Sequence, residues 1–431
     1  MAYIDTPIRP TYADTSWFTH DRLGCFIHFG SYAMAARHEW VKSRERIPEA
    51  KYDLYAKYFN PDLFDAKQWA RDIKNAGMKY AVLTTKHHEG FCMWDTRYTD
   101  YKITNTEFGR DLVREYADAL REEGIKVGFY YSLIDWHHPE YPPGPNHPRA
   151  YDPEAPEMCK NRDMKKYAKY MRDQIRELLT NYGEISYLFF DFSYKRYKPA
   201  DADNRYPYLV YKGAEEWETD ELFKVIRECQ PNILVNDRTD TEQDVWTQAE
   251  QVQPDSWMTH KETGERYIWE TCQTFSGAWG YYRDEYTWKT PEMLIQILVN
   301  TVSRGGNLLL NVGPNARGEF DSRARHALDE LGKWMHVCGR SIYGCTQSPY
   351  KAPEGFRYTQ NEQGTRLYLH MYSYPFSKIT LEGIADKVEY AQFLHDASEL
   401  LFTKNEDNSI TIKLPVLKPD VAVPVIELML V

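Results

Sequence analysis

One unit recurs along most of the chain: an amphipathic helix, a glycine or proline stop, and a short apolar strand. In segment 163–182 apolar residues recur every three or four positions up to Gly183, where the run EISYLFFD begins. The same unit is predicted with helices at 63–76, 111–123, 219–229 and 291–303. Apolar strands that alternate with helices indicate a parallel sheet that is buried on both faces.

The pattern changes after a last helix near 321–338. Short alternating segments such as SITIKL and VPVIELMLV follow, with turns between them, so a small antiparallel β domain is expected from about residue 350. Segment 136–156 is rich in proline and follows a predicted strand. It is either a stiff surface loop or a roof over an active site.

Composition limits the partners that this chain can have. The net charge is −11, from 53 basic and 64 acidic residues that are interleaved, which argues against nucleic acid as a partner. The sequence has no apolar run long enough for a membrane span and no signal-peptide pattern, so we expect a cytoplasmic protein away from the membrane. The seven cysteines are scattered without a C-x-x-C pair, which favours free thiols over disulfides or a zinc site.

Polar residues gather where the predicted strands end, and a (β/α)8 barrel builds its active site at that edge. They are His28, His87, His88, Tyr130, Tyr131, Asp191, Asp237, Arg238, Glu270 and Asn311. Asp191 ends an apolar strand, where an ionised carboxylate costs several kcal/mol unless it is charge-paired or hydrogen-bonded. Capping of a following helix is the alternative role for Asp191, but the neighbouring strand ends favour an active site.

These groups suit glycoside hydrolysis, which needs two carboxyl groups, polar groups that hold sugar hydroxyls, and aromatic walls. A metal-dependent hydrolase that uses His28, His87 and His88 is the alternative, although adjacent strand residues point to opposite faces. The sequence contains neither the G-x-S-x-G motif of serine hydrolases nor a glycine-rich nucleotide-binding loop. Several candidates also have simpler, structural interpretations. The histidines could be hydrogen-bonded core residues, Arg238 could form a salt bridge with Asp237, and Glu39 could be a surface acid. Trp40, Trp94 and Trp279 could pack in the core.

Several long segments match a known family in order. RLGCFIHFGSYAMAARHEW, MKYAVLTTKHHEGFCMWDT, SYLFFDF and ILVNDR resemble motifs of glycoside hydrolase family 29, the α-L-fucosidases, over most of the chain. The resemblance implies a (β/α)8-like barrel over 1–347 and a C-terminal antiparallel β-sandwich over 348–431. It also implies a retaining exo-α-L-fucosidase that forms a covalent glycosyl-enzyme on fucosylated oligosaccharides or glycosides, without a metal or organic cofactor.

Carried over position by position, the resemblance makes Asp191 the nucleophile. Its sugar-binding positions fall on His28, Glu39, Trp40, His87, His88, Tyr130 and Arg238, with Tyr131 as a substitute for Tyr130. The stretch TQAEQVQP favours Glu250 as the acid/base over Glu242 and Glu270.

The C5 methyl group of fucose needs an apolar wall, for which Phe192 and Phe275 are the candidates. Phe29 and Phe192 depart from the usual family pattern, so the sequence leaves open which sugar the site accepts. An α-L-galactosidase or another L-sugar exo-glycosidase is therefore one alternative function. A catalytically silent sugar-binding protein is the other.

Overall fold

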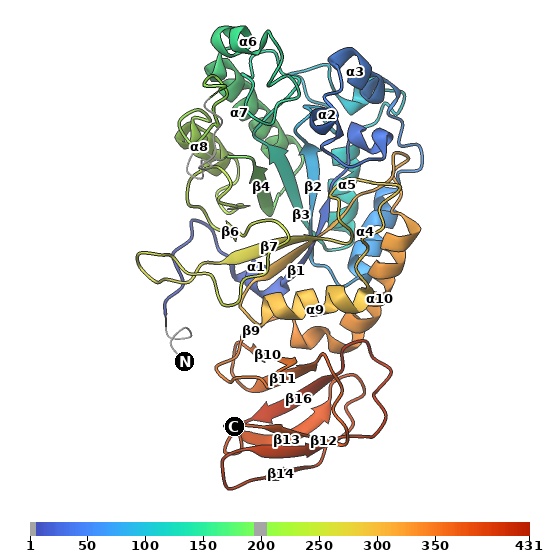
Figure 1. The fold of residues 1–431 in the computed structure, drawn as a ribbon, viewed down its shortest axis with the longest axis vertical. Coiled ribbons are helices and arrows are strands. Elements are labelled where there is room, and N and C mark those ends of the chain that lie inside the picture. The colour runs from blue at the N-terminus through green and yellow to red at the C-terminus, as the bar shows by residue number, and fades with distance from the viewer. Residues whose placement is uncertain (1–5, 194–204) are drawn as a thin grey trace.

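The computed structural model describes residues 6–193 and 205–431, and its larger part is an eight-stranded parallel sheet curled into a barrel (Figure 1). The order of the strands is β5-β4-β3-β2-β1-β8-β7-β6. Their bounds are β1 Leu23–Ile27, β2 Tyr80–Lys86, β3 Lys126–Ser132, β4 Tyr187–Asp191, β5 Leu234–Val235, β6 Trp246–Thr247, β7 Trp269–Thr274 and β8 Asn307–Val312. The predicted (β/α)8-like barrel is confirmed.

The barrel is weakest between β5 and β6, the two ends of the sheet. Each of these strands has two residues, and two isolated parallel bridges, Asn236–Val245 and Arg238–Thr241, join their continuations. The backbone N–H of Asp237 donates to the carbonyl of Val245 at 3.0 Å. The connections 236–245 and 248–268 are fully described and contain no helix. This side of the barrel therefore consists of loops, which leaves room for side chains at its mouth.

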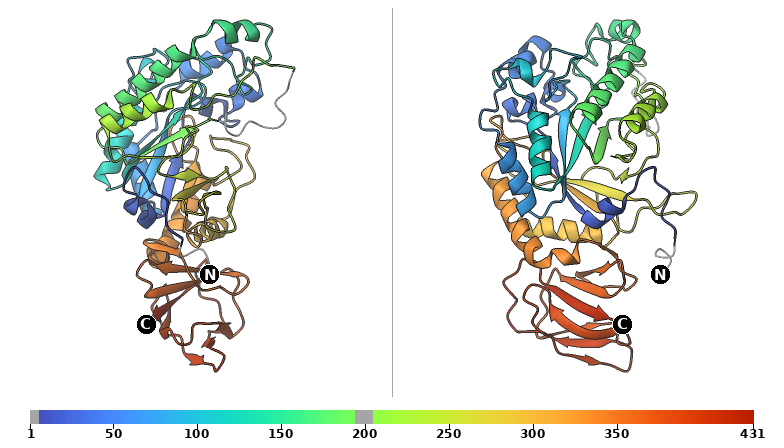
Figure 2. Two further views of the ribbon diagram at one scale, coloured as in Figure 1. Left: turned by 90° about the vertical axis from the view of Figure 1, so that its left-hand side faces the viewer. Right: turned by 180° about the vertical axis from the view of Figure 1, so that it is seen from behind.

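Helices cover the outside of the sheet (Figure 2). The longer ones are α3 Glu49–Tyr58, α4 Ala66–Asn75, α5 Leu112–Glu122, α7 Met164–Asn181, α8 Thr219–Cys229, α9 Pro291–Val302 and α10 Ser322–Cys338; the short ones are α1 Ser16–Asp21, α2 Val41–Arg44 and α6 Ala155–Asn161. An aspartate caps α4, α5, α7 and α10 by accepting from a first-turn N–H. Gly124 and Gly183, at positive φ, lie at the predicted stops after α5 and α7. None of the described helices is long and apolar enough to span a membrane.

Two antiparallel sheets form the C-terminal part, at the lower end of Figure 1. The five-stranded sheet has the order β13-β16-β11-β10-β9 and the three-stranded sheet the order β12-β15-β14. The bounds are β9 Cys345–Gln347, β10 Phe356–Asn361, β11 Arg366–Met371, β12 Lys378–Leu381, β13 Val388–Phe393, β14 Phe402–Lys404, β15 Ile410–Lys413 and β16 Val425–Leu430. Leu369 and Ile412, one from each sheet, share one apolar core, so the predicted antiparallel sandwich is confirmed. The boundary at 347/348 stays a prediction.

Side chains alternate across the barrel wall on β3 and β4, whereas the pairing of β2 with β3 shifts between Thr84 and Lys86. On β4, Phe189 belongs to the cluster inside the barrel, whereas Phe190 packs in the outer layer under the helices. On β3, Tyr130 points inward and Tyr131 outward. Successive residues of a strand face opposite sides, so only every second residue reaches the barrel interior. This alternation decides which strand residues face the barrel interior, but it does not extend past the strand ends.

Candidate active site

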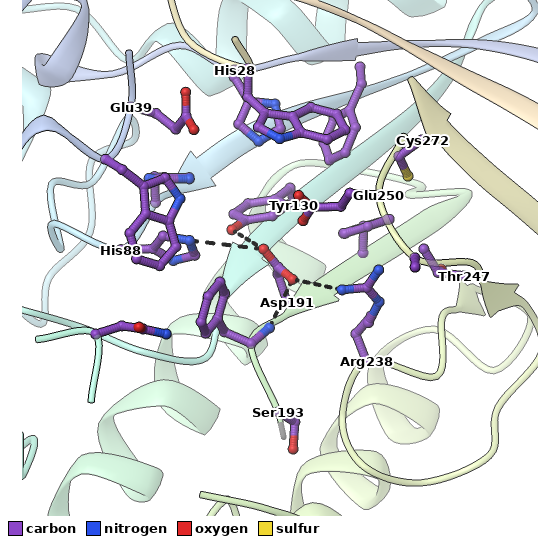
Figure 3. Close-up of a pocket in the computed structure, with 18 of the residues that line it drawn as sticks. His28, Glu39, His88, Tyr130, Asp191, Ser193, Arg238, Thr247, Glu250 and Cys272 are labelled. Carbon is purple, nitrogen blue, oxygen red and sulfur yellow. Dashed lines mark hydrogen bonds and ion pairs between the residues drawn. The ribbon is translucent and has the colours of Figure 1, made fainter. Parts of the chain in front are cut away.

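A cavity of about 740 Å³ opens at the carboxyl ends of the strands (Figure 3). Ten of the eleven predicted site residues line it: His28, Glu39, Trp40, His87, His88, Tyr130, Asp191, Phe192, Arg238 and Glu250. They come from five strand ends and from the loops after β1 and β6. The structure thus brings together residues more than 200 positions apart.

Asp191 is the last residue of β4 and lies at the centre of this group. Its side chain accepts hydrogen bonds from the Tyr130 hydroxyl at 3.0 Å (Oδ2) and from the Phe192 backbone N–H at 2.9 Å (Oδ1). The Arg238 guanidinium lies 3.4 Å from Oδ1 (Figure 3). Both carboxylate oxygens therefore have donors, and a cation faces the group.

The backbone after β4 is bent to supply one of these donors. Phe192 has a φ of 77°, in the left-handed region that bulky residues rarely adopt. Such a conformation costs about 1–3 kcal/mol and is held only when its surroundings fix it. Here the bend turns the N–H of Phe192 onto the carboxylate of Asp191.

Burial raises the pKa of Asp191 to about 7, and the nearby charge of Glu250 acts in the same direction. The Arg238 guanidinium, the Tyr130 hydroxyl and the Phe192 N–H oppose this rise by favouring the ionised form. The carboxyl group of Asp191 therefore changes its charge close to neutral pH. Its ionised form is poorly solvated and suited to attack an electrophilic carbon.

Two of the histidines have a defined tautomer. The Nδ1 of His28 lies 2.6 Å from the Oδ1 of Asn311, and the Nδ1 of His88 lies 2.7 Å from the Oγ of Ser132. Ser132 donates its own hydroxyl hydrogen to the carbonyl of Ile134, so its oxygen accepts from His88. Burial holds the pKa of both imidazoles well below the usual value. Each is neutral with its proton on Nδ1, so each Nε2 is left as an acceptor.

The loop after β1 adds a carboxyl group and an aromatic ring. Glu39 is 3% exposed and accepts from the backbone N–H of Gly280 at 2.8 Å, and burial raises the pKa of this carboxyl. The ring of Trp40 lies 5.0 Å from that of His88 and 5.1 Å from that of Phe192. Trp40 and Phe192 thus form an apolar wall beside the polar groups.

Of the three glutamates considered as acid/base, Glu250 lines the cavity, and its carboxyl group points towards Asp191 (Figure 3). Glu270 is fully buried inside the barrel, where it accepts from Tyr187 at 2.6 Å and Thr247 at 2.8 Å. Burial raises its pKa to about 7, but it does not line the cavity.

Glu242 also lies outside the cavity lining, in ion pairs with Arg9 and His260. Among the three, only Glu250 therefore shares the cavity with Asp191.

Two aromatic candidates lie on the wrong side of the barrel wall. Phe275 packs in the outer layer and lines a separate small cavity, because it is an odd number of residues from the inward-facing Cys272. Tyr131 donates to the Oε1 of Gln174 on α7 at 2.7 Å and does not replace Tyr130. Neither ring lines the site cavity.

Several cavity residues were not among the predicted sugar-binding positions. Trp279, which the sequence left between core and platform, lines the cavity with its ring 5.3 Å from that of His28. Asn146 brings the proline-rich segment to the cavity, in line with the roof interpretation. The others include Phe26, Ser43, Arg44, Phe189, Trp246, Gln248 and Cys272. The alternation of side chains along a strand predicts that Phe26, Phe189 and Cys272 face the barrel interior. No local sequence pattern predicts that the loop residues line the cavity.

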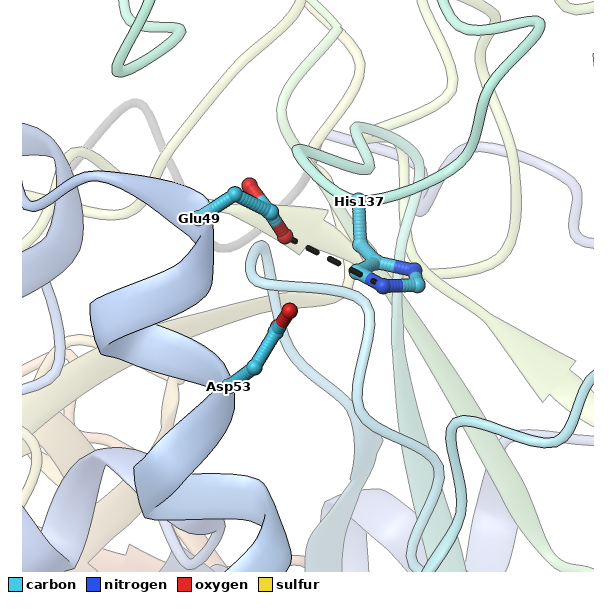
Figure 4. A group of neighbouring side chains, drawn as sticks. All are labelled: Glu49, Asp53 and His137. Carbon is cyan, nitrogen blue, oxygen red and sulfur yellow. Dashed lines mark ion pairs between the residues drawn. The ribbon is translucent and has the colours of Figure 1, made fainter.

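In the described part of the chain, the acidic and histidine side chains with metal-ligand spacing are Glu49, Asp53 and His137 (Figure 4). They lie outside the cavity lining, and the Oε1 of Glu49 is already paired with the Nζ of Lys42 at 2.9 Å. His28, His87 and His88 do not form such a group among the described residues.

Comparisons with known proteins agree on one family. The family model described as alpha-L-fucosidase matches residues 8–340. The human plasma α-L-fucosidase is 27% identical over 436 residues, which cover 93% of this chain and 85% of that protein.

Solved structures extend the likeness over the whole chain. The α-L-fucosidase isoenzyme 1 of Paenibacillus thiaminolyticus is 43% identical with a TM-score of 0.88, and covers 97% of this chain and 98% of its own. A family 29 α-L-fucosidase of Bacteroides thetaiotaomicron, trapped as a covalent intermediate with 2-fluoro-fucosyl fluoride, is 26% identical with a TM-score of 0.83 and covers 100% of each chain.

Proposed function

This chain belongs to the α-L-fucosidase family of retaining glycoside hydrolases, and on that premise we propose that Asp191 and Glu250 hydrolyse terminal α-L-fucosides in its cavity. One observation carries the assignment of the pair: Glu250 is the one candidate acid/base that lines the same cavity as Asp191. The substrate class is a fucosylated oligosaccharide or glycoside.

In the first step the ionised Asp191 attacks C1 of the sugar while Glu250 gives its proton to the leaving oxygen. The C1–O bond breaks, and a covalent bond forms between C1 and the carboxylate. Arg238 and Tyr130 keep Asp191 ionised until it attacks, because both stabilise the charged form.

In the second step Glu250, now ionised, removes a proton from water, which attacks C1 and releases Asp191. Two displacements at C1 return the original anomeric configuration. Glu250 is exposed to solvent, so water reaches it without opening of the fold.

The rest of the cavity is suited to hold the sugar. The Nε2 atoms of His28 and His88 accept hydrogen bonds from hydroxyl groups, because both Nδ1 atoms carry the proton. With Phe275 outside the cavity, the apolar wall for the C5 methyl group falls to Phe192 and its neighbour Trp40, or to Trp279 beside His28. An apolar wall excludes an added hydroxyl by only ~1–3 kcal/mol, so slow turnover of α-L-galactosides is expected.

The decisive experiment removes the nucleophile. The Asp191→Gly variant should lose at least roughly 10³-fold of its turnover of 4-nitrophenyl α-L-fucoside, and azide should restore nitrophenol release with β-L-fucosyl azide as the product. Glu242→Gln is the matched control, because this acid lies outside the cavity and should leave turnover unchanged. Wild-type-like turnover in the glycine variant would refute the assignment.

The stereochemistry and the sugar are tested with the wild-type enzyme. The first anomer of fucose seen by NMR should be α, as double displacement requires. Release of the phenol from the aryl α-L-galactoside but not from the fucoside would overturn the proposed substrate and leave the proposed mechanism unchanged. A first-formed β anomer would exclude the covalent intermediate.

For its compartment we propose the cytoplasm or another reducing environment. All seven cysteines are free, and Cys159 and Cys229 are partly exposed. Thiol titration of the denatured protein, isolated from its own cells, should count all seven as reduced. Protein with paired cysteines would contradict this proposal.

A further inference from the structure

A buried carboxyl group that the mechanism does not use lies directly behind the histidine pair. Glu89 is 1% exposed, and neither of its carboxyl oxygens has a hydrogen-bond partner on another described residue, although its own backbone N–H faces the carboxyl group. The Nδ1 of His87 lies 3.3 Å from its Oε2 and has no hydrogen-bond partner there either. Buried polar groups are rarely left unpaired, which points to a functional pairing of Glu89 with His87.

His87 differs in this respect from the other two histidines of the cavity. The Nδ1 atoms of His28 and His88 face an amide oxygen and a hydroxyl group, which do not titrate near neutral pH. The Nδ1 of His87 faces a carboxyl group that can exist in two protonation states. Its Nε2 is not among the buried unpartnered atoms, and the residue lines the cavity, so this atom is open to a ligand.

We propose that Glu89 is a positioning residue that sets the tautomer of His87 and thereby makes its Nε2 a hydrogen-bond donor to a sugar hydroxyl. This proposal rests on the proposed function, in which His87 contacts the sugar. It assigns complementary roles to the three imidazoles, because His28 and His88 accept hydrogen bonds and His87 donates one.

The chemistry follows from the proton on Glu89. A protonated carboxyl group donates its O–H to the Nδ1 of His87, since no other acceptor is hydrogen-bonded to it, and the imidazole then keeps its hydrogen on Nε2. When Glu89 loses one proton to solvent, the imidazole hydrogen moves to Nδ1, where it donates to the carboxylate. The imidazole remains neutral throughout, but its Nε2 changes from donor to acceptor.

The surroundings of Glu89 favour the protonated form at neutral pH. Burial raises the pKa of Glu89 to about 8 and lowers that of His87 to about 3. The two lysines that face Glu89 have other partners at 2.9 Å, Lys42 with Glu49 and Lys86 with Asp135. The carboxylate of Asp135 also faces Glu89 and raises its pKa, and the phenols of Tyr32, Tyr52 and Tyr101 lie around the carboxyl group.

The test measures kcat and KM for 4-nitrophenyl α-L-fucoside from about pH 6 to about pH 9.5, on either side of the Glu89 transition. Relative to Glu89→Gln at the same pH, the wild-type KM should rise roughly 10-fold through about pH 8, because one hydrogen bond to bound sugar is lost. The ratio of their kcat values should change less than about 2-fold, because Asp191 titrates in both proteins. Glu89→Gln should keep the low KM over the whole range, since its amide donates to Nδ1 and does not titrate. Glu89→Leu should show the raised KM at every pH.

Glu270→Gln is the matched control, since Glu270 is another buried carboxyl with a raised pKa but does not line the cavity. This variant should reproduce the KM profile of the wild type. A Glu89→Gln variant whose KM rises with pH as in the wild type would overturn the proposal. A Glu89→Leu variant with the wild-type KM would do the same.

A spectroscopic readout separates this proposal from the proposed function. In ¹⁵N NMR of histidine-labelled protein, the protonated nitrogen of His87 should change from Nε2 to Nδ1 through about pH 8 in the wild type but not in Glu89→Gln. An unchanged tautomer in the wild type would refute the role of Glu89 even if fucosides are hydrolysed. A tautomer change in a protein that hydrolyses no fucoside would refute the proposed function instead.

Discussion

The substitution Asp191→Asn should stabilise the fold at alkaline pH and destabilise it at acidic pH. The folded protein raises the pKa of Asp191 from 3.8 to about 7, so the folded state binds this proton more tightly than the unfolded chain does. Stability therefore falls as pH rises from about 4 to about 7, and the penalty is complete above that range. Asparagine carries no charge, so its variant escapes the penalty.

The magnitude follows from the size of the shift. A shift of about three pKa units makes a penalty of about 4 kcal/mol at pH 8, of which about 1–2 kcal/mol remains at pH 5. Asparagine loses one acceptor oxygen, so either Tyr130 or Phe192 loses its acceptor, at a cost of about 1–3 kcal/mol at every pH. The net gain at pH 8 is thus about 1–3 kcal/mol, and near pH 5 it falls to about zero or below.

The assay is the difference in melting temperature between variant and wild type over this pH range. Each kcal/mol corresponds to roughly 1–2 °C for a chain of this length, so the difference should change by several degrees between about pH 5 and about pH 8. Asp135→Asn is the control that should show no such pH dependence. The buried Lys86 ammonium lowers the pKa of Asp135 from 3.8 to about 2, so its contribution changes only below about pH 4, and its loss should destabilise the protein by the same amount at about pH 5 and at about pH 8. A pH-independent difference for Asp191→Asn would refute the reasoning.

Other expected results concern the same cavity. Arg238→Leu removes the cation that faces Asp191, so the acid limb of kcat/KM should move up by about one pH unit, and activity should fall more at acidic than at alkaline pH. Glu250→Gln should slow fucosides with poor leaving groups roughly 10²- to 10³-fold and dinitrophenyl fucosides much less, whereas Glu270→Gln should stay within about 3-fold of the wild type. Trp279→Leu should raise KM roughly 5- to 10-fold by removing an aromatic face from the sugar. Excess EDTA should leave turnover unchanged. A loss of turnover in EDTA would instead indicate a required metal ion.

The sequence predicts the barrel wall well because its signals are local. Helix periodicity and glycine stops locate the helices, and apolar runs locate the strands between them. Alternation then separates inward from outward residues: Asp191, Phe189 and Tyr187 share one side of β4, and the structure places the latter two inside the barrel. The same counting on β7 excludes Phe275 once Cys272 is known to face inward.

The loops at the mouth are less predictable, because their positions depend on contacts between distant segments. The backbone N–H of Gly280 meets the carboxyl group of Glu39, 241 residues away. No periodicity or spacing encodes such a contact. The place of Glu250 likewise depends on the irregular chain after β6, where the helices that pattern the rest of the barrel are missing. The resemblance to a family favours Glu250 over Glu242 and Glu270 as the candidate acid/base, whereas the local sequence pattern does not distinguish the three.

Asp191 and Glu250 differ in burial as the tasks proposed for them require. Asp191 is 7% exposed, and an attacking carboxylate gains reactivity when little water surrounds it, whereas Glu250 is exposed, and an acid/base must exchange protons with water in each cycle. Arg238 connects the two regions, because its Nη1 lies 3.4 Å from Asp191 while its Nη2 donates to the carbonyl of Gln248 at 3.0 Å. Gln248 precedes Glu250 by two residues, so the guanidinium that faces the proposed nucleophile also fixes the loop that carries the proposed acid/base. Loss of Arg238 should therefore impair both steps of the reaction.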